Sequence, residues 1–102
     1  MSTTDEPILT ISVAANLLKV HPRTLMLHEK AGLISPYRTS TKRRLFSIQD
    51  LSDLQFIKYL TQNKGINLQG VKILLETISL AEKEGVNLKK RLFPSFKAKK
   101  LI

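Results

Sequence analysis

Pro22 and Gly32 bracket one short segment of the chain, and together they constrain the local fold more than any other feature of the sequence. Proline suits the first position of a helix, where its missing N–H costs nothing, and glycine suits the left-handed residue just beyond a helix C-terminus. The pair predicts a helix from Pro22 to Ala31, about two to three turns long. Leu25 is expected to turn inward. Four residues are spaced to share the outer face: Arg23, Thr24, Leu27 and His28.

A second short helix is expected upstream, between Thr10 and Leu18, with Ser12 as its N-cap. Its apolar stripe is predicted to consist of Val13, Leu17 and Leu18. Residues 19–21 then form a turn, in which His21 is a turn or N-cap residue. Two short helices joined by a tight turn make a helix-turn-helix candidate, although ordinary helical domains contain such pairs too.

A basic hairpin is predicted next, over residues 37–46, which we call the wing. Its two ends can pair as short strands, and turn-forming polar residues lie between them. It contains four cations and no acid: Arg38, Lys42, Arg43 and Arg44. A basic hairpin beside a helix-turn-helix is the arrangement of a winged helix, whose wing reaches phosphates or a minor groove. A solvated surface loop is the alternative for this stretch taken by itself.

The helix-turn-helix and wing together resemble the MerR family of transcription regulators, and within it the heat-shock repressor (HspR) type. The resemblance runs from Ile8 to about Glu84 and rests on residues 11–15, 20–25, 32–38, 44–47 and 65–72. The last of these motifs, Gly65 to Lys72, resembles the HspR type in particular. The resemblance implies contacts with DNA from the second helix at Arg23, Thr24 and His28, and from the wing at Arg38, Arg43 and Arg44.

The chain also departs from the family pattern. Leu25-Met26-Leu27-His28-Glu29 stands where the family usually has an arginine after the leucine and a tyrosine before the glutamate. A cation and a phenol that commonly hold the DNA backbone are therefore missing. Leu45 replaces a second wing arginine, and Phe46 replaces a tyrosine. The full set of predicted DNA-contacting residues is Ser12, His21, Arg23, Thr24, His28, Tyr37, Arg38, Lys42, Arg43 and Arg44.

Two further helices are expected after the wing. Ser47 is the predicted N-cap of the first, with Asp50 three residues on, and the buried stripe is Leu51, Leu54, Ile57 and Leu60. Asn63-Lys64-Gly65 ends that helix, and Asn67 caps the next one. The fourth helix carries a stripe that Leu74 and Ala81 widen, so that one side can pack on the domain and the other can meet a partner. The predicted dimerisation residues are Leu68, Val71, Leu75 and Ile78.

The pattern breaks at residues 84–87, where glycine and asparagine indicate a helix end and a new start. Residues 88–93 are too short for a substantial coiled coil, so a homodimer is implied mainly by the resemblance. The chain then divides into a flexible N-terminus (1–7), a MerR-like DNA-binding domain (8–84), and a short helix with a basic tail (85–102). The predicted fold class is mainly α, a winged helix-turn-helix with a small β-hairpin wing.

Charge points to a polyanionic partner. The 102 residues carry a formal net charge of +9, and the cations cluster in the wing and between Lys89 and Lys100. A chain of this length is expected to be one domain with appendages, without a separate ligand-binding domain.

The tail from Pro94 has three open interpretations: a disordered segment, a source of extra phosphate contacts, or a basic and apolar peptide for a partner. The resemblance implies a DnaK-type chaperone as that partner.

Several classes of function find no support in the residues. The chain has no cysteine, which fits a reducing cytoplasm, and two histidines in a helix-turn-helix do not make a metal site. No triad, phosphate loop or acid pair suggests catalysis, so we predict neither enzyme activity nor a cofactor. No signal or stretch of about 20 apolar residues suggests a membrane. A bacterial, cytoplasmic and nucleoid-associated protein is expected.

The predicted function is sequence-specific binding of duplex DNA at an inverted-repeat operator, with repression of heat-shock and chaperone genes as the regulatory outcome. Two alternatives stay open. An excisionase-like architectural factor shares this fold and bends DNA without a dimer helix. A protein-interaction adaptor would use the same basic faces to bind an acidic partner.

Overall fold

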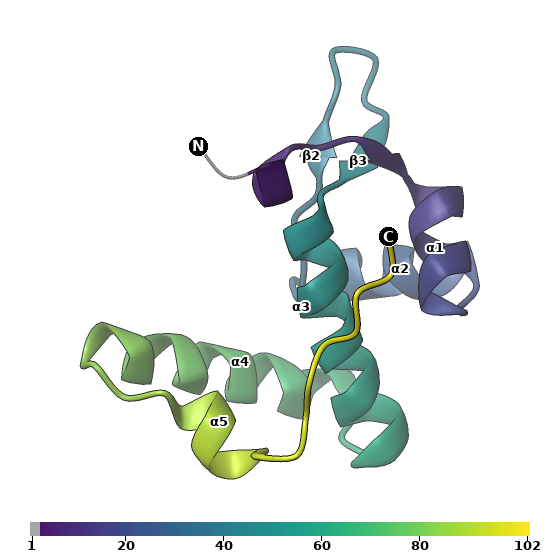
Figure 1. Cartoon of the computed structure of the whole chain (residues 1–102). Coiled ribbons are helices and arrows are strands. Elements are labelled where there is room, and N and C mark those ends of the chain that lie inside the picture. Colours follow the sequence, from purple (N-terminus) through teal and green to yellow (C-terminus); the bar gives the residue numbers. More distant parts are fainter. Residues whose placement is uncertain (1–2) are drawn as a thin grey trace.

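The computed structural model describes residues 3–102 and is mainly helical, with a small three-stranded antiparallel sheet. Helix α3 runs through the middle of the molecule, the sheet and wing lie at one of its ends, and α4 extends from the other (Figure 1). The helices are α1 (Ile11–Leu18), α2 (Pro22–Lys30), α3 (Ile48–Lys58), α4 (Leu68–Lys83) and α5 (Leu88–Leu92). A 3-10 turn, η1 (Thr3–Asp5), precedes them, and a π-helical turn, η2 (Tyr59–Asn63), extends α3. This architecture confirms the predicted winged helix-turn-helix.

The sheet has one strand more than the sequence predicted. Strand β3 (Arg44–Phe46) is central, with β2 (Tyr37–Arg38) on one side and β1 (Leu9–Thr10) on the other. Tyr37 pairs with Leu45 across the wing, as the hairpin prediction required. Leu9 pairs with Phe46, which ties the chain before α1 to the base of the wing. The sheet therefore fixes the wing against the helix-turn-helix.

The N-cap of α1 is Thr10, and the prediction of Ser12 was wrong. The Thr10 hydroxyl accepts a hydrogen bond from the Val13 N–H at 3.3 Å, and the helix has already begun at Ile11. Pairing of Thr10 in β1 brings this residue into the extended conformation that an N-cap needs. Ser12 consequently lies inside the first turn of α1, with an exposed side chain.

The shift in the start of α1 also changes its buried face. Ala14, Ala15 and Leu18 are buried, whereas Val13 is 46% exposed and Leu17 is half-buried. The predicted stripe was therefore wrong at Val13, while Leu18 is buried and Leu17 packs against the core from its edge. Small alanine side chains let α1 approach the central helix closely, which a periodicity argument based on large apolar residues does not detect.

Local signals for the other helices are confirmed. His21 caps α2, Pro22 occupies its first turn, and Gly32 adopts φ +78° just past its end. Ser47 and Asp50 form a complete capping box on α3, with mutual hydrogen bonds of 3.0 and 2.9 Å. Asn67 caps α4, Glu84 ends it, and Asn87 caps α5.

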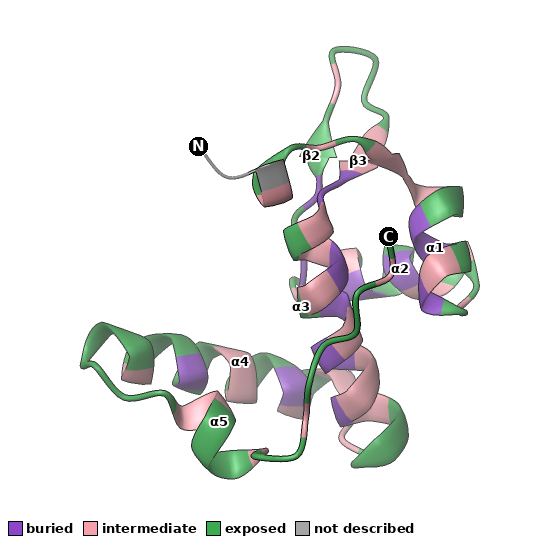
Figure 2. Ribbon diagram, viewed as in Figure 1, coloured by how far each residue is buried: buried purple, intermediate pink, exposed green. Residues whose placement is uncertain are grey.

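The core lies around α3, and it also takes in residues that were expected at a dimer interface. Leu51, Leu54, Ile57 and Leu60 are buried as predicted. Figure 2 shows that much of α4 is exposed, with isolated buried positions on the side toward α3. Those buried positions are Val71 and Ile78, while Leu68 and Leu75 are half-buried. The predicted dimerisation stripe is thus largely the face that α4 packs on its own domain.

Both ends of the chain are more ordered than the sequence suggested. Residues 1–2 of the predicted flexible N-terminus lie outside the described residues, and residues 3–5 form η1. The C-terminal tail runs back along α3 toward α1 instead of projecting freely (Figure 1). The side chain of Gln55 accepts a hydrogen bond from the Lys99 N–H at 2.7 Å and donates one to the Lys99 carbonyl at 2.8 Å. Phe96 packs against the rings of Phe56 and Tyr59.

Candidate nucleic-acid interface

Helix α2 carries the predicted contact Arg23 in its first turn and a further exposed cation, Lys30, at its last residue. The His21 Nδ1 accepts a hydrogen bond from the Arg23 N–H at 3.0 Å, which fixes the first turn of the helix. The side chain of Arg23 is exposed, Thr24 is half-buried, and Leu27 is half exposed. Leu25 is buried, as predicted. The helix therefore offers an exposed guanidinium on a rigidly capped end.

The position predicted for His28 was wrong. This side chain is only 6% exposed, and its Nδ1 has no hydrogen-bond partner within the described part of the chain. It lies behind α2, next to Leu18, Leu54 and Lys58, instead of on the outer face. Burial lowers the pKa of His28, because an apolar environment disfavours the imidazolium. A neutral, buried ring is not placed to meet a phosphate.

The tip of the wing is a tight turn with its own network of hydrogen bonds. The Lys42 N–H donates to the Thr39 carbonyl at 2.8 Å, and the Thr39 N–H donates to the Arg43 carbonyl at 3.0 Å. The Thr39 hydroxyl also accepts from the Arg43 N–H at 3.1 Å. Lys42 itself adopts φ +65°, which lets the hairpin close over a three-residue loop. The network holds the tip in a defined shape.

Glu29, near the end of α2, binds two arginines of the wing. Arg44 on β3 donates its Nε–H to this carboxylate at 2.6 Å, and Arg38 on β2 donates from Nη2 to both oxygens at 3.0 and 3.1 Å. Arg38 also donates from Nη1 to the Lys42 carbonyl at 3.0 Å. Burial tends to raise the pKa of Glu29, but the hydrogen bonds and charges of Arg44 and Arg38 outweigh it, so the pKa lies below its ordinary value. The carboxylate thus joins the wing to α2, which is the predicted recognition helix.

The ten predicted contact residues consequently fall into different groups. Arg38 and Arg44 are brought together by Glu29 and serve the wing's position. Among residues 3–102, Arg23, Lys42 and Arg43 are exposed cations without an ion pair, free to meet an anion. Two more residues are exposed at the edges: Ser12 on α1 and Tyr37 on β2.

Glu29 is the functional residue that the sequence did not single out. It is an acid close to many basic residues, and its partners lie 9 and 15 residues away in sequence. Glu29 is the only acid between residues 29 and 44, a stretch with four cations in the wing, and this could have pointed to it as their counter-charge.

Within residues 3–102, no group of three or more His, Cys, Asp or Glu side chains is arranged to hold a metal ion. None of the helices within these residues has the length and apolar character that crossing a bilayer requires.

Comparison with known proteins supplies close sequence relatives. A putative heat shock protein HspR from Streptomyces coelicolor is 43% identical over 74 residues, which cover 72% of this chain and 49% of that protein. The HTH-type transcriptional regulator GlnR of Bacillus anthracis is 36% identical over 69 residues, which cover 68% of this chain and 53% of that protein. The chain thus spans about half the length of these curated relatives.

A solved structure agrees with the sequence relatives. The fold matches HiNmlR, a MerR family regulator lacking the sensor domain, bound to promoter DNA, with a TM-score of 0.61. The match covers 82% of this chain and 75% of that chain, at 26% identity. The family model for MerR HTH family regulatory proteins matches residues 9–78, which include the helix-turn-helix, the wing, α3 and most of α4. The chain therefore belongs to the MerR family of helix-turn-helix regulatory proteins.

Proposed function

We propose that the chain is a sequence-specific DNA-binding transcription regulator, which represses heat-shock and chaperone genes in the bacterial cytoplasm by occupying their promoters. The observation that carries this proposal is the Glu29 carboxylate, which fastens the wing to α2 through Arg38 and Arg44. Because both wing strands are attached to the recognition helix, the free cations at the tip have a fixed position relative to it. Fixed cations set the register of a protein on a duplex.

The division between paired and unpaired cations supports the assignment. Glu29 neutralises charge at the base of the wing, whereas Lys42 and Arg43 at the tip and Arg23 at the start of α2 keep theirs. Phosphate contacts need free cations, and base reading needs a rigid helix end. Similarity to the HspR and GlnR proteins and to a promoter-bound MerR regulator supports DNA as the polyanion, and the HspR similarity favours stress genes.

We place the homodimer contact on the outer face of α4. Ile73 and Leu80 are 65% and 63% exposed and lie seven residues apart, on one side of the helix. A second copy of the chain would bury them and would pair two recognition helices with an inverted repeat.

A DnaK-type co-regulator stays a prediction. Since the tail is docked on α3, a chaperone that binds it would first have to release it.

The test is selection of duplexes from fragmented genomic DNA of a bacterium that encodes the chain, followed by anisotropy titration of the enriched site and of a scrambled duplex. We expect an inverted-repeat motif upstream of chaperone genes, bound at least a hundredfold more tightly than the scrambled duplex. Sedimentation of the complex should give two chains per site. A monomer that bends DNA would favour the excisionase-like factor, and no binding to any duplex would favour the protein adaptor.

A matched pair of variants separates the dimer proposal from DNA binding. Ile73→Glu should reduce the sedimenting species to a monomer and weaken binding to the full inverted repeat. Glu82→Ala, exposed on α4 nine residues from Ile73 and therefore on the opposite side of the helix, should leave both unchanged. A dimer that persists in the Ile73 and Leu80 double glutamate variant would overturn this assignment.

A further inference from the structure

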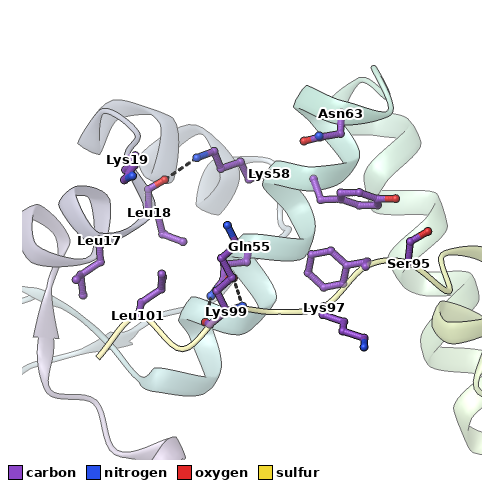
Figure 3. A pocket seen from close by; sticks show the side chains of 12 residues that line it. Leu17, Leu18, Lys19, Gln55, Lys58, Asn63, Ser95, Lys97, Lys99 and Leu101 are labelled. Carbon is purple, nitrogen blue, oxygen red and sulfur yellow. Dashed lines mark hydrogen bonds between the residues drawn. The ribbon is translucent and has the colours of Figure 1, made fainter.

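The docked tail borders a partly open cavity whose lining includes no residue of the wing or of α2. The tail lies beside α3 and reaches α1, and the space between these three segments has a volume of about 420 Å³ (Figure 3). Ligand sites for small organic molecules typically measure about 300 to 1,000 Å³. Two anchors, the Phe96 ring and the Gln55 hydrogen bonds to Lys99, hold the tail in place along this cavity.

The lining has two kinds of surface. Aromatic rings from Tyr59 and Phe96, with centroids 5.0 Å apart, form an apolar part, and Leu17 and Leu101 extend it at the α1 end. Such rings and aliphatic side chains offer a good surface for a hydrocarbon or aromatic body. A ligand seated there would touch α1, α3 and the tail together.

The polar part of the lining combines neutral side chains, Gln55, Asn63 and Ser95, with four lysines. Lys19, Lys58, Lys97 and Lys99 all border the cavity, and no aspartate or glutamate does. None of these four ammonium groups forms an ion pair with a described residue. Lys58 donates one hydrogen bond, to the Leu18 carbonyl at 2.8 Å, which leaves it two further N–H donors. Figure 3 shows Lys19 and Lys58 near each other beside the end of α1, while Lys97 points away from it.

We propose that this cavity binds a small amphipathic organic anion, with the apolar body against Tyr59 and Phe96 and the acidic head at Lys19 and Lys58. Positive charge without a neighbouring acid selects the sign of the ligand, and the aromatic floor selects an apolar body. The ligand would connect the tail to the first helix of the helix-turn-helix. Its binding would therefore make release of the tail rarer.

The experiment is a titration of the full chain with sodium octanoate, followed by two-dimensional amide NMR. Octyltrimethylammonium carries the same apolar body with the opposite charge, and acetate carries the head alone. We expect saturable shifts from octanoate at residues 17–19 and 95–101 and at the Gln55 side-chain amide, with none from acetate. Cross-relaxation between the octanoate methyl group and the rings of Tyr59 and Phe96 should locate the body. Exchange of the Lys99 amide proton should slow at least threefold.

Variants test the charge. Lys19→Gln should weaken octanoate binding at least fivefold, and Lys90→Gln, an exposed lysine of α5 outside the cavity, should leave it unchanged. Lys99→Gln is a second variant of the cavity lining. It removes an ammonium group but should keep the tail docked, because the Gln55 hydrogen bonds involve only the Lys99 backbone. Equal shifts from octyltrimethylammonium, shifts that do not saturate, or ring contacts elsewhere on the chain would overturn the proposal.

Discussion

Arg44 donates its Nε–H to Glu29 at 2.6 Å, and this hydrogen bond joins the central strand of the sheet to the recognition helix. Both side chains are largely shielded, with exposed fractions of 25% and 20%. Arg38 adds a second attachment from the neighbouring strand. One carboxylate thereby links both strands of the wing to α2, and its loss should affect DNA recognition more than folding.

Glu29→Gln should reduce operator preference while sparing affinity for random DNA. Glutamine keeps the size of the side chain but cannot form charge-assisted hydrogen bonds with two guanidinium groups. Removing a negative charge also strengthens the general attraction to phosphate. We expect the ratio of specific to random affinity to fall at least tenfold in an anisotropy titration. The free energy of unfolding should fall by about 1 kcal/mol, as for partly exposed ion pairs.

Glu82→Gln is the matched control for this experiment. Glu82 is exposed on α4, and the substitution makes the same change of net charge without touching the wing or the side of α4 that carries Ile73 and Leu80. If both variants lower the affinity ratio equally, the effect is one of net charge, and Glu29 does not position the wing.

Arg43→Ala should weaken binding to operator and random DNA by similar factors, about fivefold each at moderate salt. Arg43 is exposed at the wing tip and has no ion pair among the described residues, so its charge is available to a phosphate. Each lost phosphate contact lowers the slope of log affinity against log salt by about 0.9. A salt titration of the variant and the parent measures this slope. An unchanged slope, or a loss confined to the operator, would contradict a phosphate contact.

Lys83→Ala provides the corresponding control on the other side of the molecule. Lys83 is exposed at the end of α4, and replacing it by alanine changes the net charge by the same amount as Arg43→Ala. Its substitution should leave the salt slope within error of the parent.

Helix ends were predictable from the sequence because their causes are local. The capping box of Ser47 and Asp50, the left-handed Gly32 and the Asn67 cap each involve groups within a few residues of one another. The wing was predictable for the same reason, since its turn formers and strand ends are contiguous. The two short helices suggested a helix-turn-helix by themselves, and the neighbouring wing and the family resemblance strengthened that prediction.

Features that depend on distant segments were missed. The strand β1 exists only because Leu9 meets Phe46, and that pairing in turn makes Thr10 the N-cap of α1. His28 was placed outward by helical spacing, but α1 and α3 cover it from segments that the spacing does not describe. Glu29 and the docked tail likewise depend on contacts across the fold. Periodicity identifies a helix face but not the neighbour that covers it.

Thr10→Ala should lower the free energy of unfolding by about 1 kcal/mol, whereas Ser12→Ala should change it by less than about 0.5 kcal/mol. The Thr10 hydroxyl accepts the Val13 N–H, and Ser12 has no capping role. Thr10→Ser keeps the hydroxyl and should retain most of the stability. Urea denaturation of the three variants measures the difference. A larger loss from the Ser12 variant would restore the N-cap that the sequence first suggested.

The pH dependence of stability between pH 7.5 and 5.5 should come mainly from His28. Its pKa is lower in the folded chain than in the unfolded chain, because burial disfavours the charged ring. Between those two values the unfolded state binds more protons, so the free energy of unfolding falls as the pH decreases below about 6.5. Glu29 acts in a separate range. Its lowered pKa makes the stability that it contributes disappear only as the pH falls below the ordinary glutamate range.

His28→Leu should flatten the stability profile over this range, since leucine fills a similar volume, does not titrate and leaves no unpaired Nδ1. His21→Asn is the control, because asparagine preserves the N-cap of α2 and the buried ring remains in place. Urea denaturation at several pH values would compare the variants with the parent. The parent and His21→Asn should lose stability together below about pH 6.5, and His28→Leu should not. A profile that stays steep in His28→Leu but flattens in His21→Asn would show that the buried ring is not the titrating group, and that the environment assigned to it behind α2 is wrong.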